Sequence, residues 1–255
     1  MSYSDKEIER LRYNNRARSI NSEKYLKNKS MLGSDQVDII NRTPYIKYEE
    51  QIKKYVRECD AVLELGSGIG THTYSLINTN AEITASDISE SSIELIKHKF
   101  QNYSNLKVEI ADIEALPFNN CNFDVVCCAG SLSYGNKIVV KDEIIRVLKP
   151  GGYLIVVDSL NNNPIYRLNR FIHYLKGNRT RSTLYNMPNT KLIDEYKENF
   201  LVTFLSFYGS IIWMSPFLSF FFNNIMISKI ITKFDILINV KKSAFKFITV
   251  MRKNG

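Results

Sequence analysis

The 255-residue chain contains few cysteines, and their positions argue against several kinds of protein. The four are Cys59, Cys121, Cys127 and Cys128. Their spacing is not that of metal ligands, and the adjacent pair lies in an apolar stretch typical of inert, buried thiols. No secretory signal is found at the polar N-terminus, so we expect a cytoplasmic protein in a reducing compartment. Internal repeats and low-complexity tracts are also lacking, which argues against solenoid and low-complexity architectures.

Acidic side chains are scarce in the C-terminal part, and this changes the balance of charge along the chain. Residues 159–255 carry 14 basic and 4 acidic side chains, whereas residues 61–158 carry 7 and 12. Residues 159–193 contain no acid at all. The net charge of +8 and the pI of ≈ 9.2 therefore come mainly from the C-terminal part. A basic region beside an acidic core suggests an anionic partner.

Apolar segments typical of strands alternate with helical patterns between residues 61 and 157. We predict strands at 61–65, 82–86, 106–110, 122–128 and 153–157. The predicted helices are 70–78, 89–100 and 137–148. Strands separated by helices in this way favour right-handed βαβ units and a parallel sheet. The chain length suits one compact domain, with a helical cap over residues 1–44, a core over 45–158 and a further segment over 159–255.

A glycine-rich loop follows the first predicted strand, with glycine at positions 66, 68 and 70. Glycine lacks Cβ, so this loop can turn sharply and let its backbone approach a ligand. A dinucleotide fingerprint would have its third glycine at position 71, where this chain has Thr71. The next strand ends at Asp87, where doubly wound folds place an acid that binds ribose hydroxyls. Asp112 follows the third strand in the same way, although a lone Asp there is also typical of a helix N-cap.

These motifs, together with the Lys-Pro-Gly-Gly turn and strand of residues 146–158, resemble class I S-adenosylmethionine (SAM) dependent methyltransferases. The resemblance implies an α/β, Rossmann-like fold with a mostly parallel seven-stranded sheet of order 3-2-1-4-5-7-6, flanked by helices. Residues 200–207 and 244–251 would form its last two strands, with a helical insertion at 216–239. It also implies SAM as the cofactor, S-adenosylhomocysteine as the product, and no metal.

The family pattern assigns residues to SAM by position. In the family the glycine loop holds the methionyl part, and an acid inside the first strand orients that loop. The acids after the second and third strands take the ribose and the adenine amino group, and apolar neighbours sandwich the adenine. The cofactor-binding residues that the resemblance implies are Glu64, Gly66, Gly68, Gly70, Asp87, Ile88, Asp112, Ile113 and Ala129.

The acid-free interval 159–193 lies where the family builds its acceptor pocket, and arginine suits phosphate or carboxylate groups. The predicted substrate-binding residues are Ser131, Tyr134, Arg167, Arg170, Arg179 and Arg181. His173, whose ordinary pKa lies near neutrality, or Tyr134 is the candidate catalytic residue. The alternative interpretation of this interval is a solvated basic helix.

A more distant resemblance is to stand-alone methyltransferases of bacterial surface-polysaccharide pathways. It implies O-methylation of a small anionic acceptor such as a sugar phosphate, a nucleotide sugar, or a phosphoryl or phosphoramidate group. The uncharged run 200–228 leaves open a lipid or quinone methyltransferase with peripheral membrane contact. The high pI leaves open an RNA or DNA methyltransferase. No Asn-Pro-Pro-Tyr type of motif follows the fourth strand, so nucleic acid is not the expected partner.

The insertion at 216–239 is rich in Phe and Ile and is flanked by lysines. Three interpretations fit that composition: a substrate lid, a dimer face, or a patch that lies on a membrane surface. The protein is accordingly expected to be a monomer or a homodimer.

Overall fold

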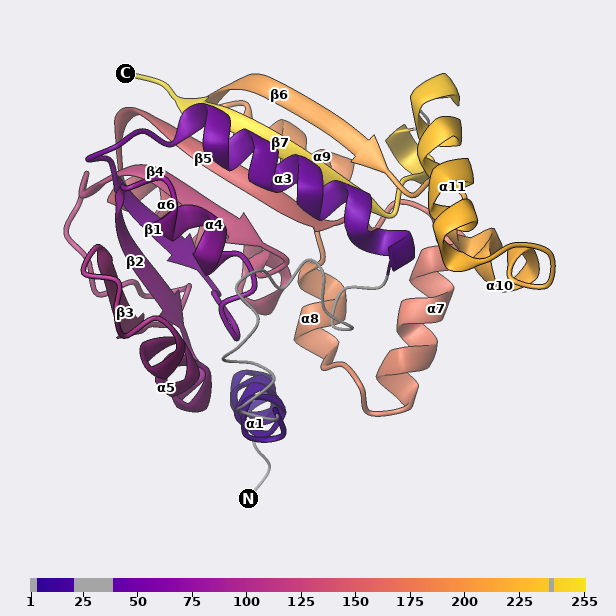
Figure 1. Ribbon diagram of the computed structural model, residues 1–255, viewed down its shortest axis with the longest axis horizontal. Helices are drawn as coiled ribbons and strands as arrows, with labels where there is room; N and C mark the ends of the chain where they lie inside the picture. The colour runs from indigo at the N-terminus through magenta and orange to yellow at the C-terminus, as the bar shows by residue number, and fades with distance from the viewer. Residues whose placement is uncertain (1–3, 21–38, 239–240) are drawn as a thin grey trace.

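The computed structural model describes residues 4–20, 39–238 and 241–255 of the chain (Figure 1). A seven-stranded sheet has the order β3-β2-β1-β4-β5-β7-β6, which confirms the predicted fold class. Its strands are β1 (Ala61–Leu65), β2 (Glu82–Asp87), β3 (Leu106–Ile110), β4 (Phe123–Ala129), β5 (Leu148–Ser159), β6 (Phe200–Tyr208) and β7 (Lys246–Lys253). The first five are parallel, and β7 runs antiparallel to both β5 and β6.

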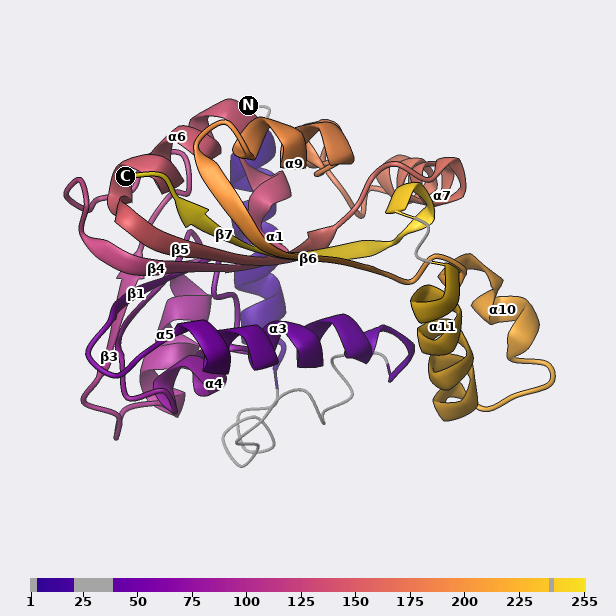
Figure 2. The same ribbon diagram turned by 90° about the horizontal axis from the view of Figure 1, so that it is seen from above.

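Helices cover both faces of the sheet because the apolar residues of its central strands point alternately to opposite sides. Leu63 and Val126 face α6 (Lys137–Val147) and α9 (Thr190–Tyr196), whereas Val62 and Val125 face the other side. On that other side lie α3 (Arg42–Tyr55) and α4 (Thr73–Ile77). Figure 2 shows these two layers above and below the sheet. Strands buried on both faces explain the near-continuous apolar runs in the sequence.

The strand and helix bounds differ from the prediction at two places near the glycine and proline residues. The helix after the glycine loop begins at Thr73 rather than at residue 70 or 71, because the loop itself continues through the turn. Strand β5 begins at Leu148 rather than at residue 153 and runs through Pro150 and Gly151. A register shift between Phe123 and Val125 of β4 absorbs this irregular segment, so the strand continues across it.

The C-terminal part adds helices around the end of the sheet. They are α7 (Pro164–Leu175), α8 (Arg181–Asn186), α10 (Ser215–Leu218) and α11 (Asn224–Ile238), with the single-turn helix η4 (Ile212–Met214). Another single-turn helix, η3 (Leu132–Tyr134), lies earlier in the chain, between β4 and α6. Helix α7 begins at its proline, and the side chain of Asn163 caps it by accepting from the backbone N–H of Ile165 at 2.8 Å. The predicted insertion between the last two strands contains α10 and α11 joined by the non-helical residues 219–223, and residue 239 lies outside the described residues. No helix in the described ranges is long and apolar enough to cross a membrane.

Helix α1 (Asp5–Arg18) lies between α5 (Glu90–Lys99) and α8, beyond the carboxyl ends of the strands (Figure 1). Polar contacts rather than a large apolar face hold it there. The buried Asn14 side chain accepts from the Ser89 hydroxyl at 2.7 Å and from the backbone N–H of Ser91 at 3.1 Å. It also donates to Glu90 at 2.9 Å. Residues 21–38 of the predicted N-terminal cap lie outside the described residues.

We expect Asn14→Ala to lower the free energy of unfolding by about 1–3 kcal/mol, because it leaves buried polar groups of the β2–α5 turn without their partner. Hydrogen exchange of the α1 amides should accelerate in the same variant. The matched control is Asn15→Ala, which removes an exposed amide from the same helix and should change stability by less than about 0.5 kcal/mol. Equal effects of the two substitutions would contradict this account of how α1 is anchored.

Candidate active site

A cavity of ≈ 290 Å³ opens at the carboxyl ends of β1, β2 and β4. Eight of the nine residues assigned to SAM by sequence line it: Glu64, Gly66, Gly68, Asp87, Ile88, Asp112, Ile113 and Ala129. The exception is Gly70, where an added Cβ would lie 3.0 Å from the Phe100 ring and 3.2 Å from Ile96. Gly70 therefore serves the packing of the loop against α5, and the other positions form the cavity wall.

At two glycines of the loop, the lack of a side chain lets another group lie close to the backbone. Gly66 has a φ of +63°, and an added Cβ would lie 2.4 Å from the Cβ of Ser131. Gly68 also has positive φ, but an added Cβ there would meet nothing within 4 Å. The Gly68 N–H donates to the Asp87 carboxylate at 2.8 Å. The loop is thus tied to the end of β2, while its middle presents bare backbone to the cavity.

Asp87 is buried at the point where β2 ends. Burial raises the pKa of its carboxyl group, and backbone N–H groups of Ser89, Gly68 and Ile88 act in the opposite direction. The Ser89 N–H donates to the second carboxylate oxygen at 2.9 Å. Each oxygen has a second lone pair for a ligand hydroxyl.

Glu64 is a carboxyl group of this cavity wall whose pKa is strongly raised. Its side chain is buried, with one oxygen accepting from the Thr73 hydroxyl at 2.6 Å. Burial is the main reason that its pKa rises to about 8. The hydrogen bond from Thr73 lowers the pKa, and the nearby charge of Asp87 raises it further. A bound cation would favour the ionised form, since opposite charges lower the pKa of an acid.

Helix α1, which lies within the predicted N-terminal cap, forms the roof of this cavity, and the sequence did not indicate which of its residues line it. It contributes Lys6, Glu9, Tyr13 and Arg16 to the lining. Lys6 also pairs with Asp112 at 2.6 Å, so the carboxylate assigned to adenine already has a cationic neighbour. The pair is partly exposed and contributes little to stability by itself.

Two further lining residues, Tyr45 and His72, were not assigned by sequence. Their rings stack at 5.2 Å between centroids, and the imidazole contacts the Glu49 carboxylate at 3.1 Å. Tyrosines alternate with charged residues in the N-terminal part of the sequence, but this pattern does not indicate which ring faces a cavity.

A second cavity of ≈ 300 Å³ adjoins the first and shares three of its lining residues, Tyr13, Arg16 and Tyr134. The hydroxyls of Tyr13 and Tyr134 are 2.5 Å apart, and the two rings stand edge to face. The remaining lining residues are Arg12, Asn169, Arg170, His173, Asn178, Arg179, Thr183 and Phe245. None of the described residues that line it is acidic, and of its four arginines Arg12 pairs with the nearby Glu9 carboxylate at 2.9 Å.

The structure brings together only part of the predicted acceptor set. Arg170, Arg179, His173 and Tyr134 line the second cavity, and Ser131 lines the first. Arg167 and Arg181 are exposed and line neither, contrary to the expectation that all four arginines converge.

The geometry of α7 explains this division. Its inward face carries Tyr166, Asn169, Arg170 and His173, and a residue next to Tyr166 in sequence is turned by about 100° around the helix axis. Arg167 therefore points away from the cavity although it lies three residues before Arg170.

Arg170 is buried, with 3% of its surface exposed. Its Nη1 donates to the carbonyl of Leu160 at 2.7 Å and to the Asn161 side chain at 3.0 Å, whereas its buried Nη2 has no hydrogen-bond partner among the described residues. Burial, and then the charge of Arg179, lower the Arg170 pKa to about 10. A guanidinium with an unused donor beside a second arginine is a strong potential anion ligand.

The tyrosines at the junction remain protonated at neutral pH. Burial raises the pKa of the Tyr134 hydroxyl, and burial together with the Tyr134 hydroxyl raises that of Tyr13. His173 is exposed, and its Nδ1 lies 3.4 Å from the Asn178 amide.

The comparisons with known proteins agree with the sheet order and the glycine loop. Residues 57–197 match the methyltransferase domain family, and the chain belongs to that family. This membership confirms the resemblance to class I SAM-dependent methyltransferases.

Curated relatives match over a shorter stretch. A demethylmenaquinone methyltransferase of Clavibacter sepedonicus is 32% identical over 104 residues, which are 39% of this chain and 41% of that protein. The sterol 4-C-methyltransferase strm-1 of Caenorhabditis elegans is 36% identical over 105 residues, 40% of this chain and 31% of that protein. The chain thus spans less than half the length of these relatives.

Solved structures extend the likeness in fold to most of the chain. A chain from the complex of the Haloferax volcanii Trm112 methyltransferase activator with a putative methyltransferase superposes with a TM-score of 0.66. The match covers 100% of both chains at 14% identity. A putative sarcosine dimethylglycine methyltransferase of Galdieria sulphuraria gives 0.59 over 84% of this chain and 86% of its own, at 16% identity.

The pKa of Glu64 predicts an unusual dependence of stability on pH. Between the ordinary glutamate pKa of 4.5 and the folded value of about 8, the folded state binds more protons at this site than the unfolded state. The free energy of unfolding should therefore fall as pH rises through this window, by up to about 1.4 kcal/mol per pH unit. Chemical denaturation between pH 5 and pH 8 measures it.

Glu64→Gln is the control, because glutamine cannot ionise yet keeps an oxygen that can accept from the Thr73 hydroxyl. The slope of stability against pH should be smaller in the variant, and the variant should gain stability relative to the wild type at pH 8. Parallel pH profiles of the two proteins would contradict the elevated pKa.

Proposed function

We propose that the protein is an enzyme that transfers a methyl group from SAM to a small anionic acceptor held in the arginine-lined cavity, by O-methylation. The observation that carries the proposal is the meeting of two cavities at Tyr13 and Tyr134, one walled by the glycine loop and the other by four arginines. When bound, SAM supplies a methyl group that its sulfonium has already activated, so the protein's main tasks are positioning and exclusion of water.

The first cavity fits SAM in its chemistry. Bare backbone at Gly68 accommodates close approach of the methionyl part, and Glu64 offers a carboxylate to its cationic groups. Asp87 has acceptor capacity for ribose hydroxyls, and Asp112, which lines the cavity together with Ile88 and Ile113, would accept from the adenine amino group. Helix α1 closes the cavity from above, which excludes water from the reacting groups.

The second cavity favours an acceptor with a phosphate or carboxylate. Arg170 and Arg179 provide guanidinium donors, and the free Nη2 of Arg170 would gain its missing partner from such a group. Sugar phosphates, nucleotide sugars and phosphoryl or phosphoramidate groups belong to this chemical class. His173 would take the proton of a hydroxyl acceptor, whereas an oxygen that is already anionic needs only orientation.

For the cofactor site, we expect Asp87→Asn to weaken SAM binding by about 1–3 kcal/mol, because the variant loses charge-assisted hydrogen bonds to the ribose. Isothermal calorimetry with SAM measures this loss. Asp124→Asn is the matched control, because Asp124 is near the opposite end of its strand, where it pairs with Lys149. Unchanged SAM affinity of folded Asp87→Asn, or an equal loss in the control, would refute the assignment.

For the acceptor site, a panel of sugar phosphates, nucleotide sugars and phosphorylated amides would first identify a substrate through release of S-adenosylhomocysteine. With that substrate, Arg179→Ala should raise KM by roughly tenfold or more, since a hydrogen bond to a charged group is worth about 1.5–3 kcal/mol. SAM affinity should stay within about twofold, because Arg179 lines only the second cavity.

Arg181→Ala is the control for that experiment, because Arg181 is exposed outside both cavities. Equal KM values for Arg179→Ala and wild type would overturn the anionic-acceptor assignment. His173→Ala in the same assay separates the two chemistries: a fall in kcat of about 10²-fold or more indicates base catalysis, and near-normal turnover indicates an anionic oxygen.

A second candidate function is methyl transfer to a quinone or another lipid at a membrane surface. Two observations favour it: the relatives with the printed names demethylmenaquinone and sterol methyltransferase, and the exposed apolar side chains between β6 and α11. Turnover of a detergent-dispersed demethylmenaquinone with no turnover of the phosphorylated panel would favour this function over the first.

A further inference from the structure

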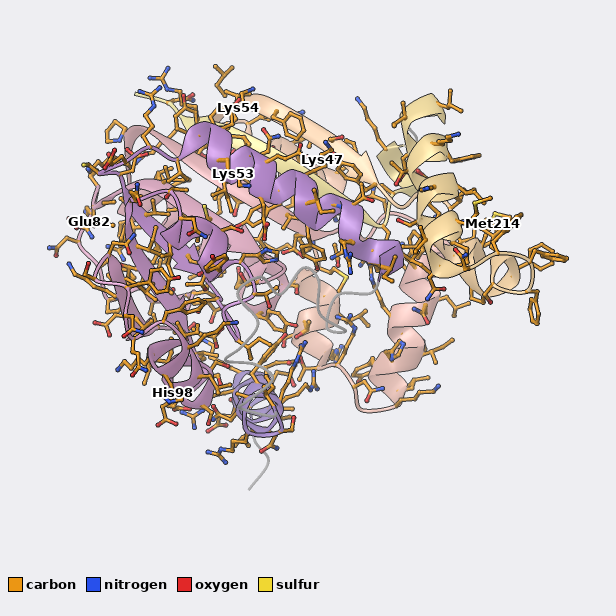
Figure 3. All side chains as sticks on the ribbon, viewed as in Figure 1. Lys47, Lys53, Lys54, Glu82, His98 and Met214 are labelled. Atoms are coloured by element: carbon orange, nitrogen blue, oxygen red, sulfur yellow. The ribbon has the colours of Figure 1, made fainter. Side chains whose placement is uncertain are left out.

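The segment that joins β6 to α11 exposes an unusual number of large apolar side chains. We call residues 213–226 the aromatic tip; its exposed members are Trp213, Phe217, Phe220, Phe221, Phe222, Ile225 and Met226. Phe220 and Phe221 are 83% and 68% exposed. The tip lies at the end of the molecule farthest from α5, where both views place α10 (Figures 1 and 2) and where Met214 is labelled in Figure 3. Soluble chains seldom leave so many neighbouring aromatic rings in water.

The aromatic tip does not cover the candidate active site. Among the described residues that line the two cavities, none belongs to residues 212–238. The structure therefore argues against the substrate-lid interpretation of the insertion, because α1 closes the cavities instead. A different partner must account for the exposed rings.

Within residues 212–238, the exposed charged side chains are all lysines. Lys229 and Lys233 are exposed on α11, one helical turn apart. Asp235 is the single acidic residue in 199–255, and it is buried. Its carboxylate accepts from the backbone N–H groups of Gly209 at 2.6 Å and Ser210 at 2.9 Å. The surface therefore presents aromatic groups and lysines with no exposed carboxylate of its own segment.

Helix α7 connects this surface to the second cavity. The Tyr166 hydroxyl donates to the Gly209 carbonyl at 2.5 Å and accepts from the Trp213 N–H at 3.3 Å, which ties α7 to the base of the tip. The outer side of α7 exposes Leu168, Phe171 and Leu175, while its inner side lines the cavity with Arg170 and His173.

We propose that the aromatic tip and the lysines of α11 bind the surface of an anionic lipid bilayer. Aromatic side chains enter the interfacial region, and each nearby lysine adds attraction to anionic headgroups. A second copy of this chain fits the surface less well. Two copies related by a two-fold axis would bring the same lysines together without a carboxylate to offset them, whereas an anionic bilayer complements the surface in both apolar character and charge.

Trp213 is the single tryptophan of the chain and lies within the tip, so it reports directly on binding. The full chain should show a blue shift of its emission and should sediment with phosphatidylcholine vesicles that contain one-third phosphatidylglycerol. Vesicles of phosphatidylcholine alone should bind much more weakly, and added salt should reduce binding to the anionic vesicles.

Two variants test the two components of the surface separately. Lys229→Gln/Lys233→Gln should lower the partition coefficient by about 25-fold, because each lysine contributes a factor of about five. Phe220→Ser/Phe221→Ser should lower it by roughly tenfold or more. The control Lys53→Gln/Lys54→Gln removes two exposed lysines from α3, away from the tip (Figure 3), and should bind as the wild type does. SAM affinity measured in all three variants checks that each is folded.

Three results would overturn the proposal. One is the absence of both the tryptophan shift and sedimentation with anionic vesicles. Another is equal loss of binding in the α3 control and in the α11 variant, which would indicate non-specific attraction. The third is a solution dimer that Phe220→Ser/Phe221→Ser dissociates without any vesicle binding by the wild type, which would assign the surface to a second copy.

Discussion

The candidate active site depends on the close approach of two backbone segments at the ends of neighbouring strands. Gly66 leaves no room for a side chain, because Ser131 occupies the space where a Cβ would be, and the Ser131 hydroxyl donates to the Leu65 carbonyl at 2.7 Å. This contact sets the start of the turn that carries Tyr134. A larger residue at position 66 would displace Ser131, and with it the wall that the two cavities share.

Helix α1 completes both cavities although its sequence is mostly polar. Polar and ionic contacts dock it on two sides, through Asn14 at the start of α5 and through Glu9, which accepts from the Thr180 and Thr183 hydroxyls near α8. Because Asn14 and Glu9 are buried, loss of either set of contacts would leave polar groups without partners, so these two side chains fix the position of the roof.

The charged groups at the site are arranged at a cost to stability. Glu64 is buried with a hydroxyl as its hydrogen-bond partner, and Arg170 keeps a buried donor that no described residue satisfies. Both side chains line a cavity rather than the closed core. A ligand of opposite charge in that cavity would pair with each of them and offset the cost of burial. Under the proposed function, the carboxyl groups of the first cavity and the arginines of the second would favour a cationic and an anionic ligand respectively.

The sequence by itself determined the features that depend on neighbouring residues: the alternating strands and helices, the glycine loop, and the positions of Asp87 and Asp112 at strand ends. Local periodicity and backbone freedom decide these, so they can be read along the chain. The tertiary structure alone decided that Tyr13 contacts Tyr134 across more than a hundred residues, and that α1 rather than the apolar insertion covers the cavities. It also decided that Arg170 faces inward and Arg167 outward, because the docking of α7 selects its buried face, and an arginine pattern along the sequence carries no information about that rotation.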